Sequence, residues 1–231
     1  METPTRFPSG VGTRKRPDPL YMYPQPDPSD LHRFWDDFDT YTAAQWTVTV
    51  TGTGTNALTA GDGGWLASAT SALANDAVYT QKTTEGFSFE AGKPAWFKWR
   101  GKVSALSATI AVGLQVTDTT PLDVTDGIYF LSTVTTGAVT IYCRKDATTG
   151  SISGTGMTLV ADTFTELAWY WDGKGNVEYF QDGVQKGTLT GVTSSTYLPD
   201  TTTTPSFGIQ TNSAAITTLT TDYILAAKSR R

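Results

Sequence analysis

Two aromatic-rich segments follow one another in the sequence, Phe164-Thr-Glu-Leu-Ala-Trp-Tyr-Trp-Asp-Gly173 and Val177-Glu-Tyr-Phe-Gln-Asp-Gly183. Each ends in Asp-Gly, a dipeptide that favours tight turns because glycine adopts a positive φ and the aspartate side chain caps the turn. Aromatic and β-branched residues between the turns favour extended strands. The two segments therefore predict a pair of adjacent antiparallel strands.

Similar short segments, separated by Gly, Asp, Asn and Thr, continue through the body of the chain. In the segment 95–103, period-two alternation places Phe97, Trp99 and Val103 on one face, and Trp96, Lys98, Arg100 and Lys102 on the other. The same alternation places Cys143 in the core. These segments predict an all-β, two-sheet antiparallel sandwich or jelly roll, with strands at 46–51, 95–103, 108–116, 128–134, 139–144, 164–171, 177–181, 184–190, 206–210 and 219–226.

The first 33 residues differ from the rest, because seven of the 11 prolines lie before residue 29. Proline fixes φ and lacks a backbone donor, so neither a helix nor a central strand is expected there. We therefore divide the chain into an extended proline-rich arm, residues 1–33, and a β-sandwich domain, residues 34–231, which ends in a short basic tail.

Composition excludes several kinds of chemistry. The only histidine is His32, so a His-dependent triad in the body and a multi-His metal site are not expected. The only cysteine is Cys143, which rules out an intrachain disulfide. The net charge is −5, and the acidic body does not suit nucleic acid as a partner. No apolar run reaches the roughly 20 residues of a membrane span, and the N-terminus lacks the apolar core of a signal peptide.

Three segments, read in order, resemble the concanavalin A-like and laminin G-like jelly rolls. Phe34-Trp-Asp-Asp-Phe-Asp-Thr-Tyr41, with Trp46, is similar to the first strand of these domains, and the segments ending at Gly173 and Gly183 are similar to their paired aromatic strands. Thr221-Asp-Tyr-Ile-Leu225 looks like the closing strand, which pairs back near the first. The resemblance spans residues 34–227 and implies a concanavalin A-like jelly roll.

Glycoside hydrolases of this superfamily carry Glu-x-Asp-x-x-Glu, or a form one residue shorter, along one strand. That spacing places a nucleophile and a general acid on the same face. The body contains no such run, and its glutamates are Glu85, Glu90, Glu166 and Glu178. We therefore expect no catalytic residues and no enzymatic activity.

A lectin would present aromatic rings on an exposed face. Trp96, beside Lys98 and Arg100, is the best candidate for such a contact face, followed by Trp35, Trp65 and Trp169. Asp118, Asp123 and Asp126 could bind a hard cation through oxygen, but their spacing departs from that of an EF-hand loop. We interpret them as a solvated turn and predict no metal and no cofactor.

A concanavalin A-like sandwich preceded by an extended arm resembles the decoration, or cement, proteins of tailed-phage heads. This resemblance implies a virion structural protein, made in the host cytoplasm and displayed on the outer surface of the head. It would bind the major capsid protein and associate with itself as a dimer or trimer, without nucleic acid or membrane. The alternative is a lectin-like, glycan-binding module of a virion fibre or tail. The capsid-binding residues of the arm would be the apolar Phe7, Leu20, Tyr21 and Tyr23 and the basic Arg6, Arg14, Lys15 and Arg16.

Overall fold

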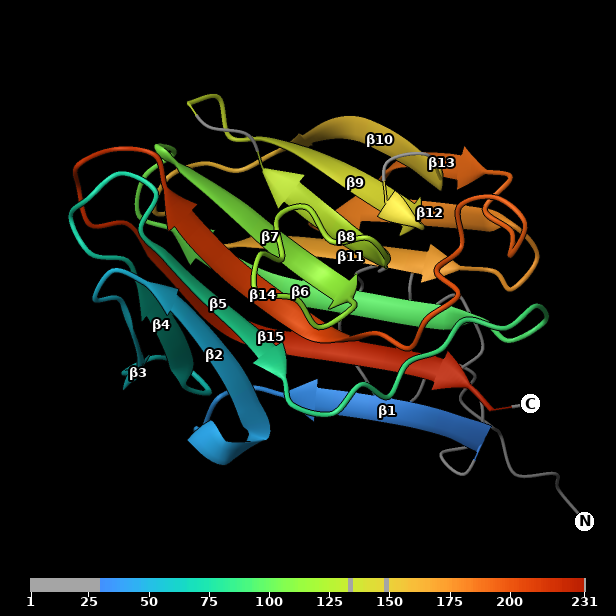
Figure 1. Cartoon of the computed structure of the whole chain (residues 1–231), viewed down its shortest axis with the longest axis horizontal. Coiled ribbons are helices and arrows are strands. Elements are labelled where there is room, and N and C mark those ends of the chain that lie inside the picture. The colour runs from blue at the N-terminus through green and yellow to red at the C-terminus, as the bar shows by residue number, and fades with distance from the viewer. Residues whose placement is uncertain (1–29, 133–134, 148–149, 231) are drawn as a thin grey trace, which may run out of the picture.

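The computed structural model describes residues 30–132, 135–147 and 150–230, which form two antiparallel sheets packed face to face (Figure 1). Sheet A follows the order β13 (Val184–Thr190), β12 (Asn176–Gln181), β11 (Thr165–Trp171), β6 (Ala95–Val103), β15 (Thr218–Ser229), β4 (Trp65–Ala69), β3 (Thr55–Thr59). Strand β1 (Leu31–Asp36) also pairs with β15. Sheet B follows the order β10 (Gly150–Thr158), β9 (Ala138–Lys145), β8 (Gly127–Ser132), β7 (Ala108–Gln115), β14 (Thr204–Thr211), β5 (Ala77–Lys82), β2 (Trp46–Thr51).

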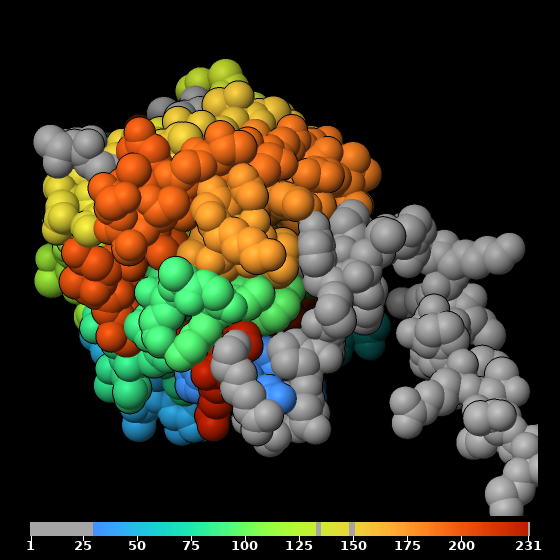
Figure 2. Space-filling model, turned by 90° about the vertical axis from the view of Figure 1, so that its right-hand side faces the viewer, coloured from blue at the N-terminus to red at the C-terminus, as the bar shows by residue number. Residues whose placement is uncertain are grey.

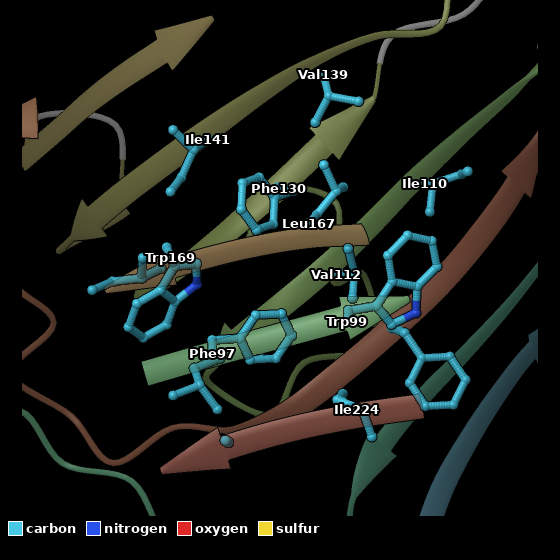
Figure 3. Close-up of a cluster of buried hydrophobic side chains, with 14 of the residues drawn as sticks. Phe97, Trp99, Ile110, Val112, Phe130, Val139, Ile141, Leu167, Trp169 and Ile224 are labelled. Atoms are coloured by element: carbon cyan, nitrogen blue, oxygen red, sulfur yellow. The ribbon is translucent and has the colours of Figure 1, made fainter. Parts of the chain in front are cut away.

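The core lies between the two sheets because every second side chain of a strand points inward. Sheet A contributes Phe97, Trp99 and Trp169, and sheet B contributes Val112 and Phe130; all five are almost fully buried (Figure 3). Burial of apolar surface stabilises the fold by roughly 25 cal/mol per Å², so these large side chains dominate the core. Cys143 is fully buried in the same core, as its alternation predicted.

The antiparallel two-sheet sandwich expected from the sequence is confirmed. The paired aromatic segments form β11 and β12, and Asp182-Gly183 joins β12 to β13 with positive φ at both residues, 50° and 74°. Asp172 begins the turn between β11 and β12, and its Oδ1 accepts hydrogen bonds from the backbone N–H groups of Lys174, Gly175 and Asn176. The predicted positive φ of the glycine is confirmed at both sites, at 75° for Gly173 and 74° for Gly183, and the predicted aspartate cap is confirmed at Asp172. The Asp182 side chain does not cap its own turn, because its Oδ1 accepts a hydrogen bond from the backbone N–H of Glu166 on β11.

The beginning of the sandwich differs from the expected boundary after residue 33. Strand β1 starts at Leu31 and pairs antiparallel with the end of β15, opposite Ser229. His32, which the sequence assigned to the arm, therefore belongs to sheet A, and its ring packs against Phe87 with centroids 4.6 Å apart. Pairing with a strand almost 200 residues away is a tertiary effect that local composition does not encode.

Figure 2 shows the end of the molecule where the two ends of the described chain meet. The blue residues of β1, the red residues of β15, the green residues of β6 and the orange residues of β11–β13 follow one another across this end. Within the described part of the chain, no helix is both long and apolar enough to cross a membrane.

Candidate functional site

The outer face of sheet A, the face turned away from sheet B, carries the predicted contact residues Trp96, Lys98 and Arg100 of β6. Strand register places Arg100 beside Glu166 of β11 and Tyr223 of β15. One step along the strands, Lys98 lies between Ala168 and Leu225. Because side chains of paired residues point to the same face, these strands form continuous rows of side chains across the sheet.

Trp35 and Tyr223 form an aromatic pair on this face. Trp35 lies on β1, opposite Leu225 of β15. Its ring stacks on that of Tyr223, with centroids 5.1 Å apart and planes inclined by 28°. Trp35 is 48% exposed, whereas Tyr223 is partly buried beneath it. We call these two residues the Trp35 platform: a flat aromatic surface open to solvent and supported from below.

Charged groups surround the platform and are paired with one another. The Tyr223 hydroxyl donates a hydrogen bond to Glu166 Oε2, and Lys98 Nζ lies 3.0 Å from the same oxygen. Arg100 forms an ion pair with Asp222. Burial, followed by the hydrogen bond to the Glu166 carboxylate, raises the pKa of Tyr223 well above its ordinary value, so its hydroxyl stays protonated as a donor.

A second aromatic pair extends the face toward the other end of β6. Phe164 and Trp65 have ring centroids 5.1 Å apart. The Arg100 guanidinium carbon lies 4.4 Å from the Phe164 centroid, and Lys102 Nζ lies 5.3 Å from it. Cations over aromatic faces are attracted by the ring quadrupole, so these contacts hold Arg100 and Lys102 close to the sheet.

The predicted contact residues reach the outer face, but their exposure differs from expectation. Lys98 and Arg100 lie beside the Trp35 platform, and Arg100 has a side-chain exposure of 39%. Trp96 points outward as its alternation predicted, yet it is only 9% exposed, and it packs against Tyr170 and Ala227. Of the other tryptophans, Trp35 and Trp65 share this face, whereas Trp169 is fully buried in the core. The arm residues Arg6, Phe7, Arg14, Lys15, Arg16, Leu20, Tyr21 and Tyr23 lie outside the described residues.

The outer face of sheet B also carries aromatic rings, but these are covered. Tyr129 and Tyr142 stack with centroids 5.8 Å apart, and Arg144 lies over both rings. The loop that follows β7 folds back on this face: Gln115 Nε2 donates to Pro121 O at 2.6 Å, and Arg144 donates to the carbonyl of Val124. Tyr129 is fully buried and Tyr142 is partly buried, so this pair of rings is less open to solvent than the Trp35 platform.

The aspartates weighed as cation ligands separate in the structure. Asp118 caps a turn, since its Oδ1 accepts a hydrogen bond from the backbone N–H of Thr120. Asp126 instead meets Asp146 and Asp200, with one carboxylate oxygen of each within 4.8 Å of the others. Lys145 Nζ lies 3.1 Å from Asp200 and already compensates part of this negative charge. The expected solvated turn applies to Asp118 and to exposed Asp123, whose backbone N–H donates to Thr120 O. It is wrong for Asp126, which is only 3% exposed, and the sequence did not reveal its grouping with Asp146 and Asp200.

Acidic residues are sparse on the strands. Among the described strands, none contains two Asp or Glu residues within its bounds. Of the carboxylates beside Tyr223, Glu166 is engaged by Lys98 and Asp222 by Arg100.

Comparison with known proteins identifies the fold. Neither a protein family nor a curated protein matches the sequence. Among solved structures, the endo-1,3-beta-glucanase of Streptomyces sioyaensis aligns with a TM-score of 0.63 and 12% identity, covering 90% of this chain and 100% of the glucanase. The fold is concanavalin A-like.

Two further structures share this concanavalin A-like sandwich. A protein of unknown function, SO2946 from Shewanella oneidensis MR-1, aligns at a TM-score of 0.59 and 16% identity over 87% of both chains. The carbohydrate recognition domain of Emp46p, in a metal-free form, aligns with a TM-score of 0.53 and 10% identity, covering 80% of this chain and 88% of that domain. The fold is thus shared by a glucanase and a carbohydrate recognition domain, and at these identities the likeness establishes the fold alone.

Proposed function

We propose that this protein is a carbohydrate-binding module that binds a glycan on the outer face of sheet A. The observation that carries the proposal is the Trp35 platform, an exposed indole stacked on Tyr223. The C–H-rich face of a sugar ring is apolar and packs on the face of an aromatic ring. The half-exposed Arg100 guanidinium and its partner Asp222 lie beside the platform, where sugar hydroxyls require hydrogen-bonding groups.

The proposed activity is binding without hydrolysis. A glycosidase of the usual kind needs two carboxyl groups flanking the bond, about 5–5.5 Å apart for retention or roughly 6.5–9.5 Å for inversion. Glu166 and Asp222 are both held in ion pairs, and Glu166 also accepts the Tyr223 hydrogen bond. These carboxylates are better suited to holding Lys98 and Arg100 in place than to transferring protons.

The similar folds support a carbohydrate ligand more than any other class. One of those proteins is named as a glucanase and another as a carbohydrate recognition domain, so the same sandwich serves sugar ligands in both. This support is an analogy between folds, and the chemical argument remains with the Trp35 platform.

The capsid-decoration hypothesis remains a prediction from the sequence. It depends on the arm, whose residues 1–29 lie outside the described part of the chain, and none of the three structures compared above is named as a decoration protein. Counting the copies of this protein in purified virions by mass spectrometry tests it: hundreds of copies per particle would support a shell component, and its absence from virions would refute the hypothesis.

A glycan array with the full-length protein tests the carbohydrate proposal. Binding to a related set of glycans, with no product released when the same glycans are incubated in solution, is the expected result. Absence of binding across the array would refute the binding proposal, and release of shorter oligosaccharides would refute the absence of hydrolysis.

A further inference from the structure

A second group of apolar residues lies on the outer face of sheet A, beside the Trp35 platform and separate from the main core. It consists of Trp96, Ala168, Tyr170, Phe180 and Ala227, with Leu31 packed at its edge, and we call it the outer apolar cluster. The rings of Trp96 and Tyr170 have centroids 5.5 Å apart. Phe180 is only 1% exposed, although its register with Ala168 places it on the outer face.

No described strand packs across this cluster. The strands that contact β6 and β11 lie beside them in sheet A or beneath them in sheet B. Without a cover, these apolar side chains on the outer face would form a patch open to water, which soluble proteins rarely leave exposed. Their burial therefore implies that another part of the protein lies over them.

The described chain begins at the edge of the cluster. Asp30 precedes Leu31, which packs against the cluster from β1. Asp30, to which residues 1–29 are joined in the sequence, therefore lies at the edge of this cluster. The last ten of residues 1–29 are Leu20-Tyr-Met-Tyr-Pro-Gln-Pro-Asp-Pro-Ser29.

We propose that residues 20–29 pack across the outer apolar cluster of their own chain. Three of these ten residues are proline, and proline-rich segments dock on aromatic surfaces because their extended conformation loses little entropy on binding. Leu20, Tyr21, Met22 and Tyr23 supply apolar side chains to bury against Trp96, Tyr170 and Phe180.

The length of the segment fits this path. A polyproline helix rises about 3.1 Å per residue, so ten residues span roughly 31 Å. Neighbouring strands are about 4.8 Å apart, and β12 is the fourth strand from β1, through β15, β6 and β11, which is roughly 19 Å. The segment can thus cross the whole cluster from Leu31 to Phe180 with residues to spare.

Packing within one chain is favoured over exchange between two copies. A short tether gives the segment an effective concentration in the millimolar range at its own cluster. The proposal also divides the arm: Leu20, Tyr21 and Tyr23 would be occupied by the sandwich, whereas Arg6, Phe7, Arg14, Lys15 and Arg16 would remain available to a partner.

Cysteine cross-linking in the full-length protein tests this proposal. One variant combines Gln25→Cys with Thr188→Cys, because exposed Thr188 lies opposite Glu178 at the far end of the cluster. The matched control combines Gln25→Cys with Thr140→Cys on the outer face of sheet B. A monofunctional maleimide first verifies that the engineered cysteines label equally, and a short bismaleimide then joins neighbouring pairs.

The expected result is at least a fivefold higher cross-link yield for the Thr188→Cys pair than for the Thr140→Cys pair. In an equal mixture of ¹⁴N- and ¹⁵N-labelled protein, every cross-linked peptide pair should carry a single label. Adding Tyr21→Ser and Tyr23→Ser should lower the yield several-fold without unfolding the sandwich. Equal yields for the two pairs, mixed-label pairs, or a yield insensitive to the tyrosine changes would overturn the proposal.

Discussion

The indole of Trp35 stacks on the phenol of Tyr223, which joins the first strand of the sandwich to the last. The two rings meet only because β1 pairs with the end of β15, so the candidate binding surface is completed by the same contact that closes sheet A. The platform therefore depends on the folded sandwich and on the hydrogen bond from the Tyr223 hydroxyl to Glu166, which holds the Tyr223 ring in place.

Tyr223→Phe should destabilise the protein by about 1 kcal/mol while keeping the aromatic stack. The change removes the hydrogen bond to Glu166, but the carboxylate retains Lys98 as a partner, so no buried charge is left alone. Denaturant unfolding measures the difference. Tyr142→Phe on sheet B is the matched control and should change the free energy of unfolding by less than about 0.5 kcal/mol; equal effects of the two changes would contradict the role of the Glu166 hydrogen bond.

Asp172→Ala should lower the free energy of unfolding by about 1–2 kcal/mol at neutral pH, because three backbone N–H groups lose their acceptor. Burial acts to raise the pKa of Asp172, but the hydrogen bonds from Asn176, Lys174 and Gly175 outweigh it and hold the pKa below its ordinary value.

The Asp172 contribution should therefore be full above pH 3.8, the ordinary pKa, and should decline as the pH falls through the lower folded value. Unfolding curves of the wild type and Asp172→Ala at pH 7 and near pH 2 measure it. A stability difference that persists unchanged at the lower pH would show that the carboxylate charge is not responsible.

His32 should titrate below its ordinary pKa of 6.5, because burial and then the nearby charges of Arg230 and Lys228 disfavour the imidazolium. The unfolded chain binds the proton more readily, so this histidine destabilises the fold as the pH drops below 6.5. Since the protein has a single histidine, one NMR signal of the imidazole follows the titration directly.

The matching stability experiment compares wild type and His32→Gln between pH 7 and pH 5. The wild type should lose more stability over this interval than the variant. A His32 pKa at or above 6.5, or identical pH dependence of the two proteins, would refute the effect.

Cys143 should resist thiol reagents in the folded protein, because complete burial raises the pKa of the thiol and blocks access to it. Labelling with a chromogenic disulfide should be negligible in native buffer and should reach one thiol per chain in denaturant. Rapid stoichiometric labelling without denaturant would contradict the placement of Cys143 in the core.

Much of the fold could be predicted because its signals are local. The Asp-Gly turns at 172–173 and 182–183 and the alternation of β6 and β9 depend on residues next to one another in sequence. Strand β10 (Gly150–Thr158) was missed, since its Gly- and Ser-rich sequence carries little strand propensity and it forms by pairing with β9.

The candidate site was harder to predict than the fold. Alternation placed Lys98, Arg100 and Trp96 on one face of the sheet, and the structure shows the same arrangement. Alternation does not reveal what covers a face, however, and Trp96 is buried. The contact of Trp35 with Tyr223 depends on the register between strands at opposite ends of the chain. The resemblance suggested that these strands approach one another, and only the structure aligns their side chains.

The most direct test of the carbohydrate-binding proposal compares the affinity of wild type, Trp35→Ala and Leu73→Ala for the best glycan on the array. Leu73 is a matched control because it is an exposed apolar side chain, as Trp35 is, but lies in the turn before β5. The expected result is at least a tenfold loss of affinity for Trp35→Ala, about 1.4 kcal/mol, in a variant that still unfolds cooperatively on heating, and no loss of affinity for Leu73→Ala. Unaltered affinity of a folded Trp35→Ala variant would contradict the proposed role of the Trp35 platform.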